Sequence, residues 1–254
     1  MLNVEKQEYS YLVGLLQADG HMHQGKGQKG KMSYEISIKD EDIIYKLEPL
    51  LNCNYSIHKR IRDTNYKKNY ESIALTICSL EFRNWLVQYV PYGKKDEIVE
   101  KPTNVIDIEY WRGIIDGNGS IGFTKRGIPF VGLVIKSDKL LQQCLQFVFE
   151  ITGQQKICNK NKRDKIYNIR INNEDSQLFL KTLYYENCLS INRKYDLARQ
   201  VMKWERPITM KKIENKKKWT SEEDNFIKNN TIEKSMQHLN RSKKSIRMRL
   251  WRLK

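Results

Sequence analysis

The chain has 254 residues and a formal net charge of +16, with 46 Lys and Arg residues against 30 Asp and Glu residues. This excess of positive charge indicates a polyanionic partner. Nucleic acid is favoured over a membrane, because the sequence has no run of about 18 apolar residues that could cross a bilayer. Hydrophobic residues make up 39% of the chain, which is low but sufficient for the core of one large domain or two small ones.

The cysteine pattern and the N-terminal residues indicate the compartment. Five cysteines are scattered along the chain without a C-x-x-C pair, which predicts neither a zinc site nor a disulfide framework. The opening residues, "MLNVEKQEYS", lack the apolar stretch of a secretory signal. We therefore expect reduced thiols in a chain that is cytoplasmic, in a bacterial or phage-infected cell, or organellar, and not secreted or bound to a membrane.

The first half of the chain begins with a predicted helix over "YLVGLLQADG", residues 11–20. A strand follows, in which Tyr34, Ile36 and Ile38 alternate with polar residues. Helical patterns then occur in "IIYKLEPLL" and "EFRNWLVQYV", and strand patterns in "NYSIHKRIR" and "ESIALTIC". The predicted order is helix, two strands, helix, two strands, helix.

The second half repeats this order. The segment "WRGIIDGNG", residues 111–119, matches the first helix, and the alternating segment "VGLVIK" matches the strand after it. A helix is expected over "LLQQCLQFVFEIT", strands over "QQKICNK" (residues 154–160) and "KIYNIRIN", and a last helix over "EDSQLFLKTLYY". Asp19 and Asn118 are 99 positions apart, as are Lys95 and Lys194, which indicates an internal duplication.

Small residues line one face of each repeated helix. Gly14 and Ala18 are four positions apart in the first helix, and Gly113 and Gly117 are four apart in the second. Residues at this spacing share a helix face, so the two helices are predicted to pack closely against each other along a seam. We expect a terminal glycine, Gly20 or Gly119, to end each helix.

If the two helices pack side by side, Asp19 and Asn118 lie together at one end of the seam. Paired oxygen ligands at the end of an apolar seam suggest a divalent-metal site between the half-domains. Mg²⁺, or Mn²⁺, accepts such hard ligands and keeps several waters, and phosphate oxygens can complete its shell. A metal held in this way can polarise a phosphate and activate water for hydrolysis.

The segments "LVGLLQADG" and "WRGIIDGNG" resemble the two motifs of a single-chain LAGLIDADG homing endonuclease, and the resemblance extends over residues 8–200. It implies an α+β fold, in which an αββαββα unit is duplicated with pseudo-two-fold symmetry and two antiparallel sheets form a saddle. It also implies a monomer that acts as a pseudo-dimer on double-stranded DNA with a long target site, encoded in an intron or in a free-standing mobile element.

The same resemblance assigns roles to individual residues. The eighth motif positions, Asp19 and Asn118, would bind the metals with the backbone carbonyls of Ala18 and Gly117. The segment "GKKDEIVEKP" resembles the lysine-containing segment that follows each half in this family. This match places Lys95, and by the repeat also Lys194, near the scissile phosphate or the attacking water. A lysine there can stabilise developing negative charge, although contacts with backbone or solvent alone are the alternative.

Composition changes after the duplicated region. Residues 201–254 contain 16 Lys and Arg residues but only 6 Asp and Glu residues. We therefore expect four segments: a first half (1–102), a second half (103–202), a basic linker (203–218) and a small module (219–254).

The small module is predicted to consist of three helices. The first is capped by Thr220 or Ser221, and Ser242 caps the last helix, in which Ile246, Leu250 and Leu253 form an apolar stripe. This is the layout of a helix-turn-helix, and the segment "WTSEED" resembles the start of a Myb/SANT-like repeat, although the middle tryptophan of that repeat is missing. The residues expected to contact DNA in the major groove are Lys243, Lys244, Arg247 and Arg249. Trp251 is expected in the aromatic core.

Two histidines are candidate DNA contacts. His21 and His23 alternate along a predicted strand, so both can face the same side, and DNA contact is favoured over metal ligation because no third histidine is near in sequence.

Asn118 has no negative charge, so metal binding at that half should weaken. Cleavage of both strands at a reduced rate, nicking of one strand and loss of cleavage all stay open, as does an engineered Asp-to-Asn change.

Three functions are therefore considered. The first is a Mg²⁺-dependent, site-specific DNA endonuclease of the homing type, which both motifs and both lysines favour. The second is a non-cleaving DNA-binding regulator built on a degenerate domain, which Asn118 favours. The third is an RNA maturase, which the charge permits but which the helix-turn-helix does not favour.

Overall fold

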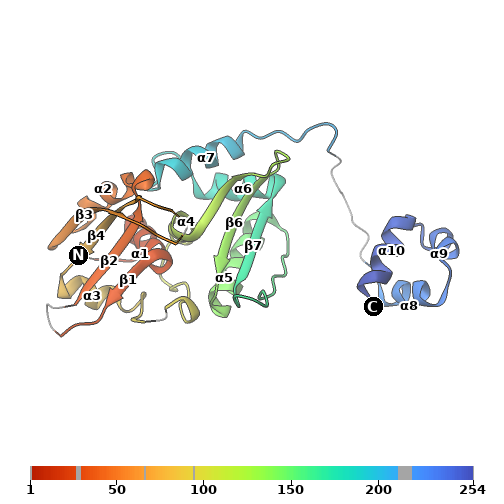
Figure 1. Cartoon of the computed structure of the whole chain (residues 1–254), viewed down its shortest axis with the longest axis horizontal. Helices are drawn as coiled ribbons and strands as arrows, with labels where there is room; N and C mark the ends of the chain where they lie inside the picture. Colours follow the sequence, from red (N-terminus) through yellow and green to blue (C-terminus); the bar gives the residue numbers. More distant parts are fainter. Residues whose placement is uncertain (1, 27–29, 66, 94, 211–218, 254) are drawn as a thin grey trace. The chain divides into compact units, whose positions relative to one another are not determined.

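The computed structural model describes residues 2–26, 30–65, 67–93, 95–210 and 219–253. The chain divides into two compact units, Met1–Glu205 and Arg206–Lys254 (Figure 1). The linker expected at residues 203–218 falls partly outside the described residues, because 211–218 are not among them. In the described part of the chain, no helix is long and apolar enough to cross a membrane.

The first half of the larger unit has the predicted order of elements. They are α1 (Gln7–Asp19), β1 (Gly20–His23), β2 (Lys31–Ser37), α2 (Asp42–Leu47), β3 (Tyr55–Arg62), β4 (Tyr70–Ile77) and α3 (Leu80–Leu86). Short 3-10 turns precede and follow α2, and a third, Lys95–Glu97, follows α3. The strands form an antiparallel sheet in the order β1-β2-β4-β3.

The second half departs from the predicted duplication by one strand. Its elements are α4 (Asp107–Asn118), β5 (Gly119–Phe123), β6 (Pro129–Ile135), α5 (Asp138–Thr152), β7 (Tyr167–Asn172), α6 (Asn173–Leu183) and α7 (Asn192–Met202). The antiparallel sheet has the order β5-β6-β7, and the strand expected over residues 154–160 is absent. That prediction was wrong because the segment is polar and its one large apolar side chain, Ile157, is 90% exposed, so it has no face to bury.

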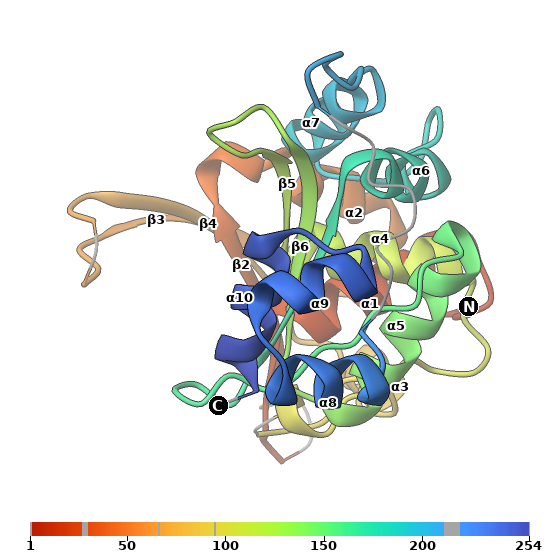
Figure 2. The same cartoon turned by 90° about the vertical axis from the view of Figure 1, so that its right-hand side faces the viewer.

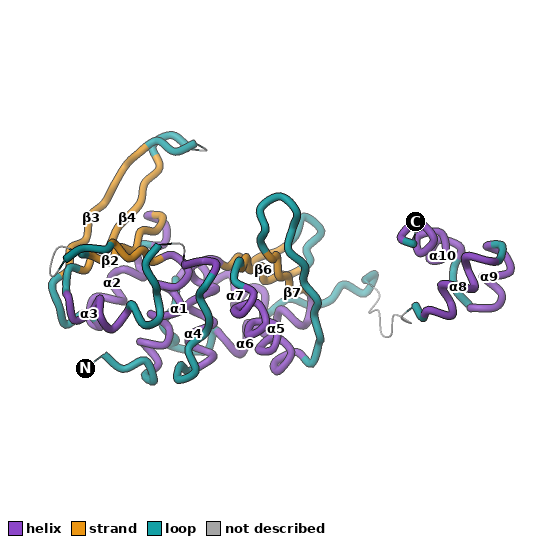
Figure 3. Tube along the Cα trace, turned by 90° about the horizontal axis from the view of Figure 1, so that it is seen from below, coloured by secondary structure: helices purple, strands orange, loops and turns teal. Residues whose placement is uncertain are grey.

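Strands and helices form separate layers in the larger unit. Seen from below, the strands lie along one side and the helices along the other (Figure 3). The hairpin of β3 and β4 projects beyond the rest of its sheet, as Figures 2 and 3 both show. Nearly every side chain of β3 is exposed, whereas the middle of β4 is buried. Most of β3 is therefore open to solvent.

Helices α1 and α4 lie side by side in the middle of the larger unit (Figure 1). Almost the whole of each helix is buried, from Tyr9 to Ala18 in α1 and from Glu109 to Asp116 in α4. One hydrophobic cluster joins α1 to the first sheet, and a second joins α4 to the other sheet. A helix that is buried on all sides must carry small residues where its neighbour's backbone approaches.

The glycines that follow the two helices serve another purpose than the one expected. Gly20 and Gly119 have φ of −68° and −86°, in the extended region, so a left-handed helix cap is not the reason for them. A Cβ at Gly20 would lie 2.6 Å from the Leu16 carbonyl oxygen, and one at Gly119 would lie 2.6 Å from that of Ile115. Close packing against the last helical turn therefore requires glycine at both positions.

The smaller unit contains three helices, α8 (Ser221–Asn229), α9 (Ile232–Leu239) and α10 (Lys243–Arg252). Thr220 caps α8 in a capping box with Glu223, and Ser242 caps α10, as the sequence predicts. Ile246 is fully buried, and Leu250 and Leu253 pack partly buried against the same small core. A left-handed residue, Asn240, ends α9 and permits the short turn into α10.

Candidate metal and nucleic-acid site

The seam between α1 and α4 brings the four small residues of the sequence motifs together. A Cβ at Gly14 would overlap the Tyr110 carbonyl oxygen, and one at Gly113 would overlap that of Tyr11. Lower in the seam, a Cβ at Gly117 would overlap the Cβ of Ala18. The two backbones are therefore in contact along the full seam, and the last residues of both helices are held near one another.

Asp19 and Asn118 are the last residues of α1 and α4 and lie at this end of the seam. The Asp19 carboxylate reaches across it, since a Cβ built at Gly117 would lie 3.5 Å from Asp19 Oδ2. The Asp19 side chain is exposed to solvent, but nearby protein atoms remove part of the water around its carboxylate. This desolvation raises the pKa of Asp19, and the positive charges of Lys95 and Lys194 oppose the rise. The site therefore disfavours the carboxylate until a cation arrives.

The two predicted lysines are buried and bind the ends of the two helices. Lys95 Nζ donates to the carbonyl oxygens of Leu16, at 2.9 Å, and Gly20. Lys194 Nζ donates to those of Ile115 at 2.8 Å, Asp116 at 2.6 Å and Gly119 at 2.9 Å. It also contacts the Gly117 carbonyl, an expected metal ligand, at 3.5 Å. A cation at a helix C-terminus satisfies carbonyls without an intrahelical partner and offsets the negative end of the helix dipole. Both lysine ammonium groups therefore contact backbone carbonyls at the helix ends.

Burial lowers the pKa of both lysines. The pKa of Lys95 falls to about 8, because desolvation outweighs the nearby charges of Asp96 and Asp19. The pKa of Lys194 is lowered for the same first reason, and Asp116 opposes that effect. Both side chains thus add positive charge beside the carboxylate near neutral pH, with Lys95 close to its titration point.

A pair of crossed hydrogen bonds links the motif helices, and the sequence did not reveal it. Tyr11 Oη donates to Asp116 Oδ2 at 2.7 Å, and Tyr110 Oη donates to Gln17 Oε1 at 2.5 Å. Tyr11 and Tyr110 are 99 positions apart, as are Gln17 and Asp116. Each helix therefore supplies a donor to the sixth motif position of the other. The only signal in the sequence was the shared spacing of these polar residues.

The sixth motif positions also hold the lysine-containing segments in place. Gln17 Nε2 donates to the carbonyls of Tyr89 at 2.8 Å and Glu100 at 3.1 Å. Asp116 accepts from Tyr184 Oη at 2.7 Å and from the Ile191 N–H at 2.9 Å. Asp116 is thus fully engaged inside the protein and does not reach the seam end, in agreement with the sequence-based view that it cannot replace an acid at position 118.

The donors at the seam end suit a hard divalent cation. Among the described residues, no group of three or more His, Cys, Asp or Glu side chains could hold a metal. Oxygen donors are available instead from the Asp19 carboxylate and the Asn118 amide. The last hydrogen bond of α1 runs from the Gly20 N–H to the Leu16 carbonyl, so the Ala18 carbonyl lies beyond the hydrogen bonds of the helix. Lys95 binds the carbonyls of Leu16 and Gly20 and not that of Ala18. These few oxygens fit a cation such as Mg²⁺, which keeps several waters.

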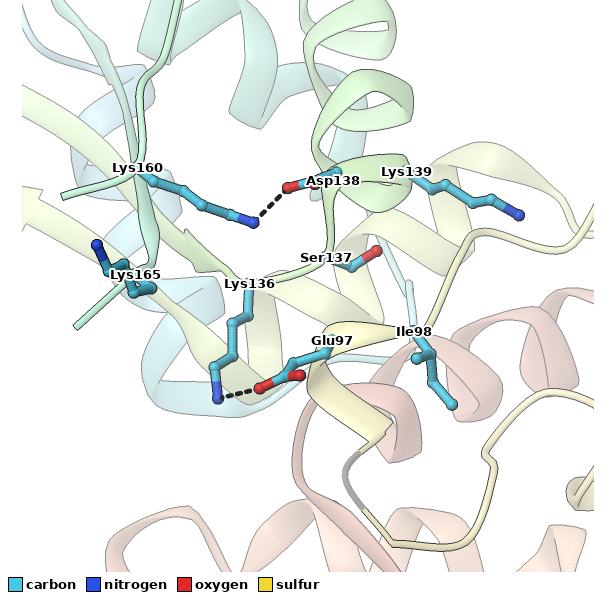
Figure 4. A pocket seen from close by; sticks show the side chains of 8 residues that line it. All are labelled: Glu97, Ile98, Lys136, Ser137, Asp138, Lys139, Lys160 and Lys165. Atoms are coloured by element: carbon cyan, nitrogen blue, oxygen red, sulfur yellow. Dashed lines mark ion pairs between the residues drawn. The ribbon is translucent and has the colours of Figure 1, made fainter. Parts of the chain in front are cut away.

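An open cavity of about 260 Å³ adjoins the Asn118 side of the seam, and Ala18, Asn118, Asp96 and Lys136 are among its lining residues. A larger basic pocket of about 610 Å³ lies next to it, where β6 ends and α5 begins (Figure 4). Its lysines are Lys136, Lys139, Lys160 and Lys165.

Ion pairs engage most of these lysines. Lys136 pairs with Glu97 at 3.2 Å and Lys160 pairs with Asp138 at 2.6 Å (Figure 4). Lys139 pairs with Glu100 at 3.2 Å. The pocket keeps an excess of positive charge beside the seam end, which suits the phosphates of a polyanion.

The strand face near the seam carries further candidate contacts. His21 and His23 lie on the same face of β1, with ring centroids 4.3 Å apart, and His23 Nε2 is 3.1 Å from Ser33 Oγ. Burial and the neighbouring His21 and Lys31 lower the pKa of His23. His23 is therefore mainly neutral near pH 7. The histidine pair has no acidic or thiol partner that would complete a metal site in the described residues.

Two expectations for the smaller unit need correction. Arg249 binds Asp224 with two hydrogen bonds of 2.7 and 2.6 Å, and its guanidinium lies over Trp219, so this half-buried side chain is engaged within the unit. Trp251 is 72% exposed and is not part of the core. The aromatic contribution to that core comes from Trp219 and Phe226.

The other three basic residues assigned to α10 are exposed. Lys243, Lys244 and Arg247 all face solvent, and Lys243 forms a weak ion pair with Glu233 at 3.4 Å. They leave the outer surface of the last helix positively charged, as expected for a helix that meets a phosphate backbone.

Comparison with known proteins identifies part of the chain. Residues 6–91 match a family described as the LAGLIDADG-like domain. Among solved structures, the homing endonuclease I-WcaI bound to its DNA recognition sequence is 15% identical, with a TM-score of 0.55, over 78% of this chain and 87% of that one. A mutant of I-SmaMI is 13% identical, with a TM-score of 0.51, over 76% of this chain and 89% of that one.

A third similar structure is the full-length DUF199/WhiA from Thermatoga maritima, 12% identical over 99% of this chain and 91% of that one. Its TM-score of 0.49 is too low to support an argument about fold. The stronger matches agree with the antiparallel sheets and the paired helices described above. The chain therefore contains a LAGLIDADG-like domain, and its fold is similar to that of homing endonucleases.

Proposed function

We propose that the chain is a site-specific DNA endonuclease of the homing type, which hydrolyses phosphodiester bonds with the help of Mg²⁺ or Mn²⁺. The observation that carries this proposal is the seam end, where the Asp19 carboxylate crosses to the second helix beside Asn118 and a buried lysine lies on each side. Asp19, Asn118 and the Ala18 carbonyl would hold the metal, which supplies polarisation of a phosphate and an activated water.

The rest of the site would bind and orient the DNA. The open strand face, with the basic arm of β3 and β4, would lie against the duplex, and the basic pocket beside Asn118 would receive backbone phosphates. Lys95 and Lys194 would fix the ends of α1 and α4, which keeps Asp19 in position. Their charges would also stabilise negative charge that develops on the phosphate.

Asn118 makes the two halves of this site chemically unequal. Of the two motif helices, only α1 ends in a carboxylate, Asp19, so we expect the two DNA strands to be cut at different rates. Nicking of one strand is the outcome that this asymmetry favours most directly.

The test is a strand-resolved cleavage assay. Supercoiled DNA that carries a target selected from a random library is incubated with Mg²⁺ and the full chain, and nicked and linear products are measured separately. Asp19→Asn should abolish both products, and Asn118→Asp should increase the linear product. If the unaltered chain and Asn118→Asp neither nick nor cut a duplex that they bind, the endonuclease proposal fails.

Asn118 also supports a second candidate, a DNA-binding protein that does not cleave. A single carboxylate binds a divalent metal more weakly than a pair, and a site without metal would still bind the duplex through its lysines. The two candidates differ in one readout. A regulator gives a metal-independent footprint and no product with either metal, and Asn118→Asp does not change that result.

The smaller unit is proposed as a second DNA reader of the helix-turn-helix type, with α10 in the major groove. The exposed Lys243, Lys244 and Arg247 on this helix support the assignment. Because the two DNA-binding units are linked in one chain, binding of one unit raises the effective concentration of the other at the target. Removal of the unit after Glu205, the boundary between the compact units, should weaken binding and shorten the footprint. An unchanged footprint would contradict this role.

A further inference from the structure

One face of α10 combines positive charge with two exposed apolar side chains. Trp251 is 72% exposed and Met248 is 46% exposed, which is unusual for large apolar residues in so small a unit. At about 100° per residue, Lys244, Arg247, Met248 and Trp251 fall within one quarter or so of the helix circumference. The opposite side of the helix carries the buried Ile246.

The residues on the opposite side of α10 make the contacts that pack the helix into the unit, which leaves this face exposed to solvent. Ile246, Leu250 and Leu253 contact the small core, while Arg249 is held by Asp224. No hydrogen bond or ring contact is assigned to Trp251 or Met248 within the part of the smaller unit that the structure describes. An exposed apolar pair that no fold contact explains suggests a contact with a partner.

The charge around the pair indicates which partner fits. Lys244 and Arg247 flank Met248 on the same face, so a polyanion is favoured over an apolar protein surface. With ten residues, α10 is about 15 Å long, and the major groove of B-DNA is wide enough to admit an α-helix. In that groove the thymine 5-methyl group is the apolar feature of the base edges.

We propose that Met248 and Trp251 form an apolar surface that packs against thymine methyl groups, so that α10 selects A·T pairs in the major groove. This inference rests on the proposed DNA-binding function and specifies what the smaller unit would recognise. Lys244 and Arg247 would bind the flanking phosphates and fix the helix in the groove, whereas Met248 and Trp251 would distinguish thymine from a base without the methyl group.

The experiment uses the full chain without metal, so that the duplex stays intact. A preferred duplex is selected from a random library, and each thymine in the region protected by the smaller unit is replaced by deoxyuridine, which lacks only the methyl group. Loss of a contacted methyl should weaken binding about fourfold, the factor that corresponds to burial of one methyl-sized group.

Protein variants separate this contact from effects on DNA shape. Trp251→Ala and Met248→Ala should weaken binding to the thymine duplex and bind the thymine and deoxyuridine duplexes equally. Trp251→Phe and Met248→Leu, which keep an apolar surface, should retain the preference for thymine. Leu178→Ala removes an exposed apolar side chain of α6 in the other unit and should leave binding to both duplexes unchanged.

Each outcome decides the inference. Equal binding of the two duplexes by the unaltered chain overturns it, as does a thymine preference that persists in both alanine variants. A change in sedimentation on Trp251→Ala, without a change in DNA affinity, would assign the face to self-association instead. If the chain binds no duplex at all, the proposed function fails with it, whereas binding without a methyl effect contradicts this inference alone.

Discussion

The two motif helices share a backbone arrangement but exchange their polar residues. In α1 the buried sixth position is an amide, Gln17, and the terminal eighth position is an acid, Asp19. In α4 the buried position is the acid, Asp116, and the terminal position is the amide, Asn118. Each motif therefore carries one carboxylate, but only α1 delivers it to the seam end. Fold symmetry thus constrains where side chains point, while the charge at each place is free to differ.

The segments that join the halves show a similar exchange of charge. The start of α7 reaches the first half, where Arg193 binds Asp40 at 2.7 Å and the Asn192 N–H binds Asp42 at 2.9 Å. The segment after α3 reaches the second half, where Glu97 binds Lys136 at 3.2 Å. Arg193 of the second half thus binds an acid of the first half, and Glu97 of the first half binds a lysine of the second half.

The largest effect is expected for Asp19→Asn, which removes the single carboxylate from the seam end. Cleavage should fall by at least about a hundredfold, since a metal contributes several kcal/mol of charge stabilisation that would be lost. Burial raises the pKa of Asp19, so its charged form is unfavourable and the neutral amide should also raise the thermal midpoint in EDTA. Product analysis and thermal denaturation measure the two effects. Glu150→Gln, an exposed charge change on α5, should alter neither.

The next effect tests whether both helices contribute equally to the seam. Gly14→Ala and Gly113→Ala each place a methyl group against a carbonyl oxygen of the facing helix, so each should lower the free energy of unfolding by about 1–3 kcal/mol or more. Gly122→Ala, whose nearest neighbour is 3.9 Å away, is the matched control and should be almost neutral. Urea denaturation of the three variants checks this, and a large difference between the first two would show that the seam is not symmetric.

Asn118→Asp restores equal acids at the seam end and should change the ratio of products. We expect several-fold more linear product relative to nicked product, because the second half gains a charged metal ligand. The same change places a second carboxylate near Asp19, so the thermal midpoint without metal should fall. An unchanged product ratio would show that position 118 does not set the difference between strands.

The smallest effect concerns the titration of Lys95. Its pKa is lowered from 10.5 to about 8 by burial, so between these values the unfolded chain binds more protons than the folded chain. Folding stability contributed by this group should therefore rise with pH from about 8 to 10.5. The slope of unfolding free energy against pH in this window should be smaller for Lys95→Met. An equal slope in both proteins would mean that Lys95 titrates at its ordinary value.

The sequence predicted those features that depend on local pattern and spacing. The helices that carry the two motifs, the alternating strands beside them and the caps of α8 and α10 follow from residues close together in the chain. The repeat of 99 residues is enough by itself to predict that Gly14 and Gly113 occupy equivalent places in the seam. Such features are accessible because a short periodic segment fixes which face is buried.

The missed features depend on contacts between distant residues. Tyr11 and Asp116 are far apart in sequence, and nothing near either one indicates that they share a hydrogen bond. Residues 154–160 were expected to form a strand because the first half has one at the matching place, but no neighbouring strand pairs with them. Trp251 was expected in the aromatic core because of the resemblance to a Myb-like repeat, but its side chain is 72% exposed. In each case, contacts between distant parts of the chain determined the structure and overrode the local sequence pattern.

The two lysine caps have a consequence for the order of binding. The ends of α1 and α4 each carry about half a negative charge, and Asp19 adds one more. Lys95 and Lys194 offset these charges at the seam end. An aspartate at position 118 would add a further negative charge and repel phosphate. The chain is therefore expected to bind DNA first and to gain affinity for the cation only afterwards, when the phosphate supplies the charge that Asn118 lacks.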